Sequence, residues 1–488
     1  MSDPPSGDLL DSSLAPLPPV ARAPRLSPWV TAGCSVVVGV LIGVFVLGRP
    51  STPLEGLDRP DDSLARLVSR QLDLREALVR TVALEQALGV LLGALDATLD
   101  EPVAWYEELA EADEVAGPPS PDTDLHRAIL LGEAGRGAEA RAQAAAWRRG
   151  EGDRPRRAAW VLAAYGDAPA DRALAEQALV EIREDLPPSW FSDTLAVRIA
   201  ARIGDDARRA EAEAAILARG RALLWRWRGL VLGQLALVLG GAAALRVLLS
   251  RRGRAPLGAA LLPPPWPPWD GFGLFVRSAF GFLVIGGLPP LLASGRSAVA
   301  AIGGLAAGVP AVAWIAGYLT AAGRPPLAVF GLRVRRADMG ALAGVTLALI
   351  ALGIVGEAVI TLVAAGLDMR SHWADGFPED VLWEPWWLVA VSTVDTALWA
   401  PFVEELTFRG VVFGSLRVWL PAVPAALLSA VLFAGAHGYG ATGFASVLWS
   451  GIVWALAYER TRSLWPSILA HTANNLLVNI TIVGLLRL

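Results

Sequence analysis

Long runs of apolar residues constrain the fold of this chain more than any other feature. A helix needs about 20 apolar residues to cross the hydrocarbon core of a bilayer. The 488-residue sequence contains several such runs, the first from Trp29 to Gly48 and the others from Gly229 onward. Only 18% of its residues are charged, below the roughly 25% usual in soluble domains. The sequence therefore predicts an all-α, polytopic membrane helix bundle.

The apolar runs divide the chain into about nine expected spans. Residues 1–28 are rich in Pro and Ser and are expected to form a disordered tail, followed by a transmembrane anchor at 29–48. A secretory signal peptide is the alternative for this run, but its core would be only about 7–15 residues long. The next span is expected at 229–249. The remaining spans are expected at about 271–293, 298–321, 340–366, 386–406, 421–437, 443–458 and 465–486.

The segment at residues 50–222 is charged and has no run that could span a membrane. Its amphipathic stretches predict an inserted soluble α-helical domain. Gly135 and Gly204 each separate two helical stretches, which is typical of helical hairpins. A solenoid-like array and an irregular helical bundle both fit this pattern. An array of stacked hairpins would offer a binding surface to a protein partner.

The distribution of arginine predicts the orientation in the membrane. Every basic residue of the chain is Arg, which is typical of a bacterial protein with an Arg-rich composition. If the N-terminus is cytoplasmic, the short cytoplasmic loops hold more arginines than the short loops on the opposite side, including Arg251, Arg333 and Arg460, as the positive-inside rule requires. The soluble domain would then be extracytoplasmic, and the protein would lie in the bacterial inner (plasma) membrane. No basic patch for nucleic acid is evident.

Ionisable residues inside the last spans are candidates for chemistry, because each costs about 3 kcal/mol to insert. Glu404 and Glu405 are followed by Arg409, which lies four residues after Glu405 and is expected to pair with it. Glu404 is rotated by about 100° from Glu405 on a helix, so we expect that the two carboxylates cannot share a partner. The alternative is an interfacial acid pair at the end of a helix.

Two further late spans carry polar groups. His437 ends one span, and His471 and Asn475 lie four residues apart on one face of another. A hydrogen-bonded buried imidazole, or hydrogen bonds between helices, would also explain these residues.

The ordered set of motifs resembles the CAAX protease and bacteriocin-processing (CPBP, or Abi) family. The matching patterns are Glu-Glu-x-x-x-Arg, Phe-x-x-x-His and His-x-x-x-Asn, each in a separate late helix. The matching residues are Glu404, Glu405, Arg409, Phe433, His437, His471 and Asn475. Each motif alone is weak, but the ordered set is more specific. The resemblance predicts a catalytic domain at 270–488 and leaves the first two spans and the insert outside it.

This resemblance implies hydrolysis of a peptide bond inside the membrane, in a hydrophobic or lipid-anchored peptide or protein. Enzymes of this family remove the last three residues of prenylated proteins. By analogy, Glu404 and His437 would activate a water, and His471 and Asn475 would stabilise the oxyanion. Glu405, Arg409 and Phe433 would support them.

The cofactor requirement stays open at this point. Glu404, His437 and His471 are the candidate ligands of a divalent metal such as zinc. The zinc motif His-Glu-x-x-His is absent from the sequence, and a glutamate base without a metal fits as well.

Two other functions fit the sequence less well. A non-enzymatic membrane scaffold would act through the domain at 50–222. A transporter would be expected to show inverted repeats, and none is evident.

Overall fold

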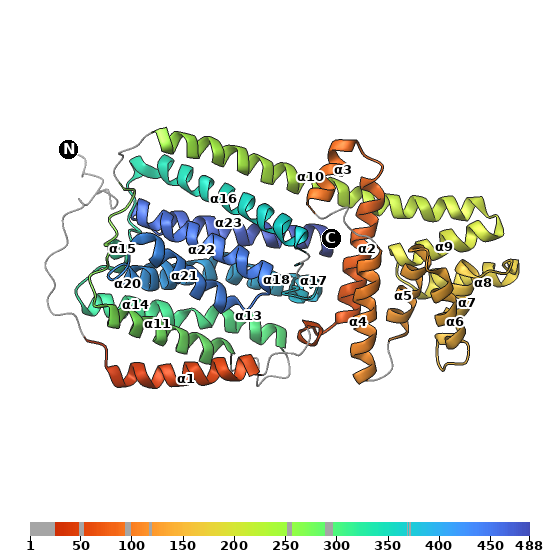
Figure 1. Cartoon of the computed structure of the whole chain (residues 1–488), viewed down its shortest axis with the longest axis horizontal. Coiled ribbons are helices and arrows are strands. Elements are labelled where there is room, and N and C mark those ends of the chain that lie inside the picture. The colour runs from red at the N-terminus through yellow and green to blue at the C-terminus, as the bar shows by residue number, and fades with distance from the viewer. Residues whose placement is uncertain are drawn as a thin grey trace, which may run out of the picture. The chain divides into compact units, whose positions relative to one another are not determined.

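The computed structural model describes residues 25–47, 53–92, 99–116, 120–250, 256–287, 296–367, 369 and 372–488. Within these ranges the chain forms helices joined by turns and loops, with no strand (Figure 1). The expected all-α fold is therefore confirmed for the described residues. Most of the tail expected at 1–28 lies outside them. The chain divides into two compact units. Unit 1 is Met1–Arg49 with Leu232–Ile480, and unit 2 is Pro50–Val231 with Thr481–Leu488.

Unit 1 holds the apolar helices. Its first elements are α1 (Pro28–Leu47), the end of α10 (Asp206–Ser250), α11 (Pro268–Phe282), η2 (Leu283–Gly287), α13 (Arg296–Ala307), α14 (Val309–Ala321), α15 (Pro326–Val329), η3 (Arg336–Asp338), α16 (Met339–Gly366) and α17 (Glu379–Trp383). Then follow α18 (Trp386–Val394), η4 (Asp395–Trp399), α19 (Ala400–Glu404), η5 (Glu405–Phe413), α20 (Gly414–Leu416), α21 (Ala422–His437), α22 (Ala441–Thr461) and α23 (Trp465–Ile482).

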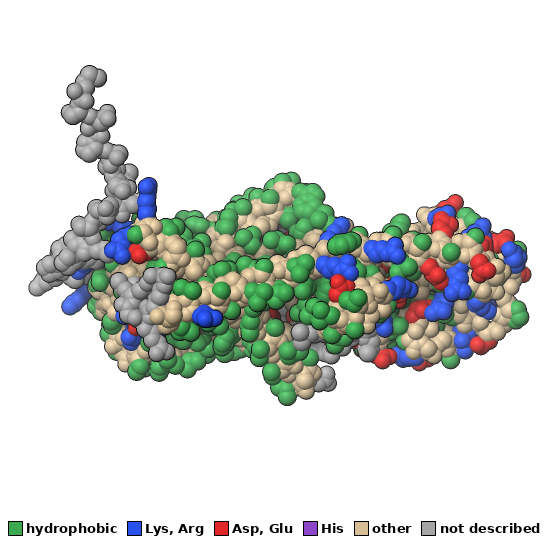
Figure 2. All heavy atoms as spheres, turned by 90° about the horizontal axis from the view of Figure 1, so that it is seen from above, with side chains coloured by type: hydrophobic (Ala, Val, Ile, Leu, Met, Phe, Trp, Pro, Cys, Tyr) green, Lys and Arg blue, Asp and Glu red, His purple; other side chains and the backbone are tan. Residues whose placement is uncertain are grey.

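Seven helical segments among the described residues are long and apolar enough to cross a membrane. They are Asp206–Ser250, Pro268–Gly286, Ile302–Ala321, Arg336–Gly366, Trp386–Leu416, Ala441–Thr461 and Trp465–Arg487. Two shorter apolar helices, Pro28–Val44 and Ala422–His437, accompany them. Each span expected from the sequence corresponds to one of these segments. On the face that Figure 2 shows, hydrophobic and uncharged side chains cover most of unit 1, and charged side chains gather on unit 2.

A hydrophobic cluster in unit 1 brings α16, α21, α22 and α23 together around Phe433 and Trp454. Helices α21 and α22 form a tightly packed hairpin that turns at Gly438, whose φ is 69°. A Cβ at Gly451 would lie 2.8 Å from the Cβ of Ala430 and 3.4 Å from Arg409 Nη2. The absence of a side chain at Gly451 therefore lets α22 approach α21 and the buried arginine.

Unit 2 is built from shorter helices. They are η1 (Pro53–Gly56), α2 (Pro60–Leu78), α3 (Ala83–Leu91), α4 (Asp100–Ala116), α5 (Pro121–Glu133), α6 (Gly137–Trp147), α7 (Arg154–Tyr165), α8 (Arg172–Asp185), α9 (Trp190–Ile203), the start of α10, and η6 (Val483–Arg487). Successive helices from α4 to α9 pack against each other, and α7 also packs against α5 and α9. Gly135 adopts a positive φ between α5 and α6, which pack against each other. Gly204 adopts a positive φ between α9 and α10, which are joined by the hydrogen bond from Arg219 to Asp193. The last residues of the chain are held in unit 2 because Arg66 donates to the carbonyls of Leu486 and Arg487.

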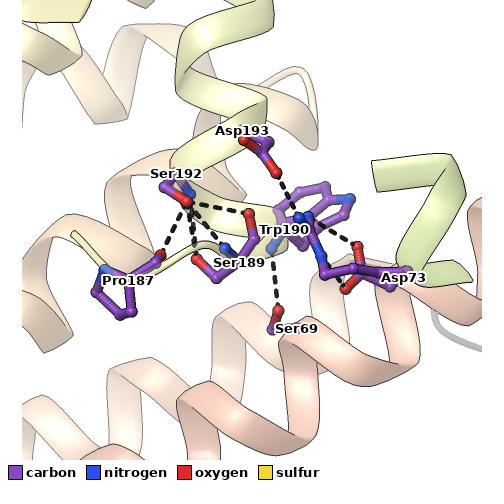
Figure 3. Close-up of polar contacts among 8 residues, drawn as sticks. Ser69, Asp73, Pro187, Ser189, Trp190, Ser192 and Asp193 are labelled. Carbon is purple, nitrogen blue, oxygen red and sulfur yellow. Dashed lines mark hydrogen bonds and ion pairs between the residues drawn. The ribbon is translucent and has the colours of Figure 1, made fainter. Parts of the chain in front are cut away.

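A buried ion cluster fixes α2 against α9 and α10 in unit 2 (Figure 3). Asp73 is 1% exposed, and its two carboxylate oxygens accept from Arg219 at 2.9 and 3.2 Å. The same guanidinium donates to Asp193 at 2.6 Å. Nearby, Ser69 Oγ accepts from the backbone N–H of Trp190 at 3.0 Å. A buried carboxylate needs such partners because desolvation of an unpaired charge costs several kcal/mol.

Candidate active site

Two neighbouring glutamates lie where the helix Trp386–Leu416 changes register. Helix α19 ends at Glu404, and the π-helical segment η5 begins at Glu405. Another π-helical segment, η4, precedes them at Asp395. A π-turn is wider than an α-turn and is often found at functional sites. The local register therefore sets where each carboxylate points.

Pro401 explains how this helix is tied to α23. Proline has no N–H, so in the π register the carbonyl of Thr396, five residues earlier, has no main-chain donor. Asn475 Nδ2 donates to this carbonyl at 2.8 Å. The predicted site residue Asn475 is therefore held against the helix that carries the glutamates.

Glu405, Arg409 and His471 form a buried cluster. Their exposures are 0%, 1% and 4%. Glu405 Oε1 lies 2.8 Å from Arg409 Nη1, which confirms the expected pair, and 3.1 Å from His471 Nδ1. A carboxylate can only accept, so in this contact His471 donates its Nδ1–H. That leaves His471 Nε2 directed away from Glu405.

The two glutamates share His471, so the expectation that they cannot share a partner is wrong. His471 Nε2 lies 3.7 Å from Glu404 Oε2, while Nδ1 contacts Glu405. The two ring nitrogens of an imidazole point in different directions. One ring on a facing helix can therefore bridge two carboxylates that diverge from their own helix.

His437 faces Glu404 from α21. Its Nδ1 lies 2.8 Å from the carbonyl of Phe433 and therefore donates to it. In the neutral ring, Nε2 then carries the lone pair. This Nε2 lies 4.0 Å from Glu404 Oε2. The separation is too long for a direct hydrogen bond, and Glu404 keeps a partly exposed side chain.

Aromatic rings enclose the buried cluster. The guanidinium carbon of Arg409 lies 4.1 Å from the ring centroid of Phe433 and 5.1 Å from that of Trp454. Trp454 also stacks on His471, with centroids 4.3 Å apart and planes 26° apart. Phe433 was expected at the site from its motif. Trp454 was not, because a tryptophan in an apolar span resembles any packed or interfacial residue.

Two more polar residues lie around this site. The ring of Tyr439 is 5.5 Å from that of His437, and Asp395 begins the π-helical segment η4 on the helix that carries Glu404. Neither residue belongs to the motifs that drew attention to the site. The other two histidines, His126 and His372, lie in unit 2 and in the loop that follows α16.

Glu404, His437 and His471 are the residues that could hold a metal. Glu404 Oε2 lies between the two imidazoles, 3.7 Å from one Nε2 and 4.0 Å from the other. Even so, the described part of the chain contains no group of three or more His, Cys, Asp or Glu side chains placed to hold a metal ion.

The fold and this cluster define a class: an integral membrane protein with a polar Glu-His site among its last helices. Residues 383–477 match the family model of the type II CAAX prenyl endopeptidase Rce1-like proteins. The chain thus carries an Rce1-like domain, and the domain includes every candidate site residue named above from Glu404 to Asn475. The resemblance found in the motifs is confirmed over this range.

The chain is also similar to one curated protein. The chain is 29% identical over 145 residues to the "Putative membrane peptidase YdiL" of Bacillus subtilis (strain 168). The match covers 28% of this chain and 53% of the relative, so the chain spans about half the length of the curated relative it matches. No solved structure matches the chain significantly.

Proposed function

We propose that this protein is an intramembrane endopeptidase that hydrolyses a peptide bond in a membrane-associated or hydrophobic substrate. The observation that carries the proposal is the position of Glu404 Oε2, within 4.0 Å of Nε2 of both His437 and His471. A carboxylate beside two imidazoles in a membrane bundle is costly to insert. The Rce1-like domain that contains these residues supports the same activity.

In the proposed reaction, a water is held between Glu404 Oε2 and His437 Nε2. Glu404 takes a proton from this water as the water oxygen attacks the carbonyl carbon of the scissile bond. The C–N bond then breaks, and the proton passes from Glu404 to the departing nitrogen. The products are a carboxylic acid and a free amine.

His471 and Asn475 are proposed to stabilise the oxyanion. When protonated on both nitrogens, His471 donates Nδ1–H to Glu405 and can donate Nε2–H to the developing oxyanion. The amide of Asn475 has two hydrogens, and the carbonyl of Thr396 takes one of them. The second hydrogen is then free for the substrate.

Glu404→Gln in the purified full-length protein tests the proposal. With a fluorogenic apolar peptide, we expect kcat/KM to fall by about 10²–10⁴-fold, because general-base catalysis contributes that much. The matched control is Glu357→Gln, an exposed acid in the span α16, which should keep normal activity. Undiminished cleavage by the Glu404→Gln protein sinks the proposal.

The proposal extends to the substrate and the location. We propose a hydrophobic or lipid-anchored peptide as substrate, and the bacterial inner (plasma) membrane as location. The N-terminus would be cytoplasmic and the soluble domain at 50–222 extracytoplasmic, as the arginine bias favours. Labelling of single cysteines in 121–203 by a membrane-impermeant maleimide in intact cells tests this orientation, and a lack of labelling contradicts it.

A further inference from the structure

Both polar side chains of helix α3 in unit 2 are hydrogen-bonded to the protein. Only two residues of Ala83–Leu91 are polar, Glu85 and Gln86. Glu85 accepts two hydrogen bonds from Arg228, at 3.0 and 2.8 Å. Gln86 Nε2 donates to the carbonyls of Val79 and Thr81, at 3.0 and 2.9 Å. Both polar side chains of the helix are therefore occupied by the protein itself.

The outward face of α3 is apolar. Leu84 is 70% exposed and Val90 is 57% exposed, and the flanking Val82 and Leu92 are exposed as well. Ala83 and Ala87, on the same face, are also exposed. A surface helix of a soluble domain has the opposite arrangement, with polar residues outward. This face therefore differs from one that is adapted to water.

The surroundings of α3 show which medium this face meets. Arg228, which binds Glu85, also stacks on Trp225 with its guanidinium carbon 4.9 Å from the ring centroid. Trp225 is 69% exposed. Immediately afterwards, from Gly229, helix α10 becomes an apolar membrane-spanning segment. An exposed Trp and an Arg at the end of a span are typical of the interface between lipid and water.

The inner face of α3 is anchored to the same part of α10. Leu88 packs against a buried cluster that includes Leu78, Leu224 and Trp227. The apolar outer face of α3 is therefore held beside the residues at which α10 changes from polar to apolar. Very little of the apolar stretch of α10 is buried inside the protein, as expected of a stretch that faces lipid.

We propose that α3 is an interfacial helix that docks unit 2 onto the bilayer surface, with Leu84 and Val90 inserted at the boundary between headgroups and acyl chains. A helix with an apolar face and no exposed charge on it binds at that depth through its buried apolar area. The continuity of this face with the lipid-facing start of the α10 span favours lipid over a protein partner or a second copy of the chain. This inference does not depend on peptidase activity.

Spin labelling of the full-length protein in phosphatidylethanolamine–phosphatidylglycerol vesicles tests the proposal. The single native cysteine, Cys34, is first replaced by Ala. Nitroxides are then attached at Leu84→Cys or Val90→Cys. Leu174→Cys and Val180→Cys on α8 are the matched controls, because these residues are similarly exposed in the same unit, at 65% and 51%.

We expect labels at 84 and 90 to be severalfold more accessible to oxygen, relative to a water-soluble nickel chelate, than labels at 174 and 180. Equal access of the nickel chelate at all four positions overturns the proposal, because the face then meets water. Labels at 84 and 90 that are immobilised and shielded from both reagents also overturn it. That result assigns the face to a protein contact.

Discussion

At the residue scale, the geometry around His471 separates the roles that we propose for the two adjacent acids. Glu405 is completely buried and contacts both Arg409 and His471 Nδ1. Its position therefore fixes the imidazole so that Nε2 faces Glu404. Glu404 is partly exposed and can reach a substrate or a water.

Trp454 is expected to position His471 without contacting the substrate. Trp454 is 4% exposed and stacks on the imidazole. An aromatic pair contributes about 0.5–1.5 kcal/mol, so Trp454→Leu should lower kcat by up to about tenfold and leave KM nearly unchanged. Trp454→Phe should recover most of the loss, because a ring again covers the imidazole. Steady-state kinetics on the apolar peptide measures both.

Trp266→Leu provides the control for this prediction. Trp266 is as buried as Trp454, but it donates to Ser415 and does not contact the site. Both Leu variants should lower the midpoint of thermal unfolding, and only Trp454→Leu should lower kcat. If the Phe variant is as slow as the Leu variant, Trp454 acts only as packing.

The motif residues of the site could be predicted from the sequence because polar groups are rare in apolar spans. Glu404, His437 and His471 can be recognised in this way. The structure places Nε2 of each histidine within 4.0 Å of Glu404 Oε2. The sharing of His471 could not be predicted, because it depends on the packing of one helix against another. For the same reason, no pattern in the sequence connects Asn475 with the carbonyl of Thr396.

At the element scale, the helix Trp386–Leu416 that carries the two acids contains two π-helical segments, which set the directions of the carboxylates. The two π-helical segments η4 and η5 lie on either side of α19. Pro401 frees a carbonyl that Asn475 then satisfies. The expected span ended at 406, whereas the helical segment continues to Leu416. The sequence pattern missed this extension because Arg409 and the residues around it interrupt the apolar run.

Helix α2 of unit 2 depends on the buried cluster of Asp73, Arg219 and Asp193. Arg219→Met leaves Asp73 without its partner at 1% exposure. Removing one partner of a buried pair costs about 3–5 kcal/mol. We therefore expect faster amide hydrogen exchange in peptides from α2 and α9 of the full-length protein. Peptides from α21 to α23 should be unchanged.

The same exchange experiment includes two comparisons for Arg219→Met. Arg183→Met breaks an exposed pair with Glu211 in unit 2 and should cost less than about 1 kcal/mol. Adding Asp73→Leu to Arg219→Met removes the unpaired carboxylate and should restore much of the protection. Equal exchange in the Arg219→Met and Arg183→Met proteins would show that the buried cluster adds nothing to stability.

At the scale of the whole molecule, the sequence predicted the helices better than their grouping. Hydropathy located the spans because a bilayer imposes a minimum length on an apolar helix. Gly135 and Gly204 marked two turns between helices in the sequence, because glycine is the usual residue where the chain needs a positive φ, and both adopt one. The grouping of Thr481–Leu488 with unit 2 was not predicted. It rests on hydrogen bonds from Arg66 to main-chain carbonyls, which leave no pattern in the sequence.

The free energy of unfolding of unit 2 should decrease in mild acid because of His126. This imidazole stacks on Phe191 and contacts the hydroxyl of Tyr106 at 3.3 Å. Burial lowers the pKa of His126 from 6.5 to about 4. The unfolded chain therefore binds a proton near pH 6.5, and the folded chain binds one only near pH 4. Stability is unaffected above pH 7 and is lost as the pH falls through this window, by at most about 3 kcal/mol.

His126→Phe isolates this effect from the titration of carboxylates. Phenylalanine keeps a ring against Phe191 but cannot take up a proton, so its stability should depend less on pH. Thermal unfolding of both full-length proteins, followed in unit 2 by a fluorophore on Leu174→Cys in a Cys34→Ala background, measures the difference. At pH 7 the wild-type protein should be at least as stable as the variant, because it keeps the contact with Tyr106. At pH 4.5 its unfolding midpoint should have dropped further than that of the variant. Parallel pH profiles for the two proteins would mean that His126 is already protonated, or exposed, in the folded state.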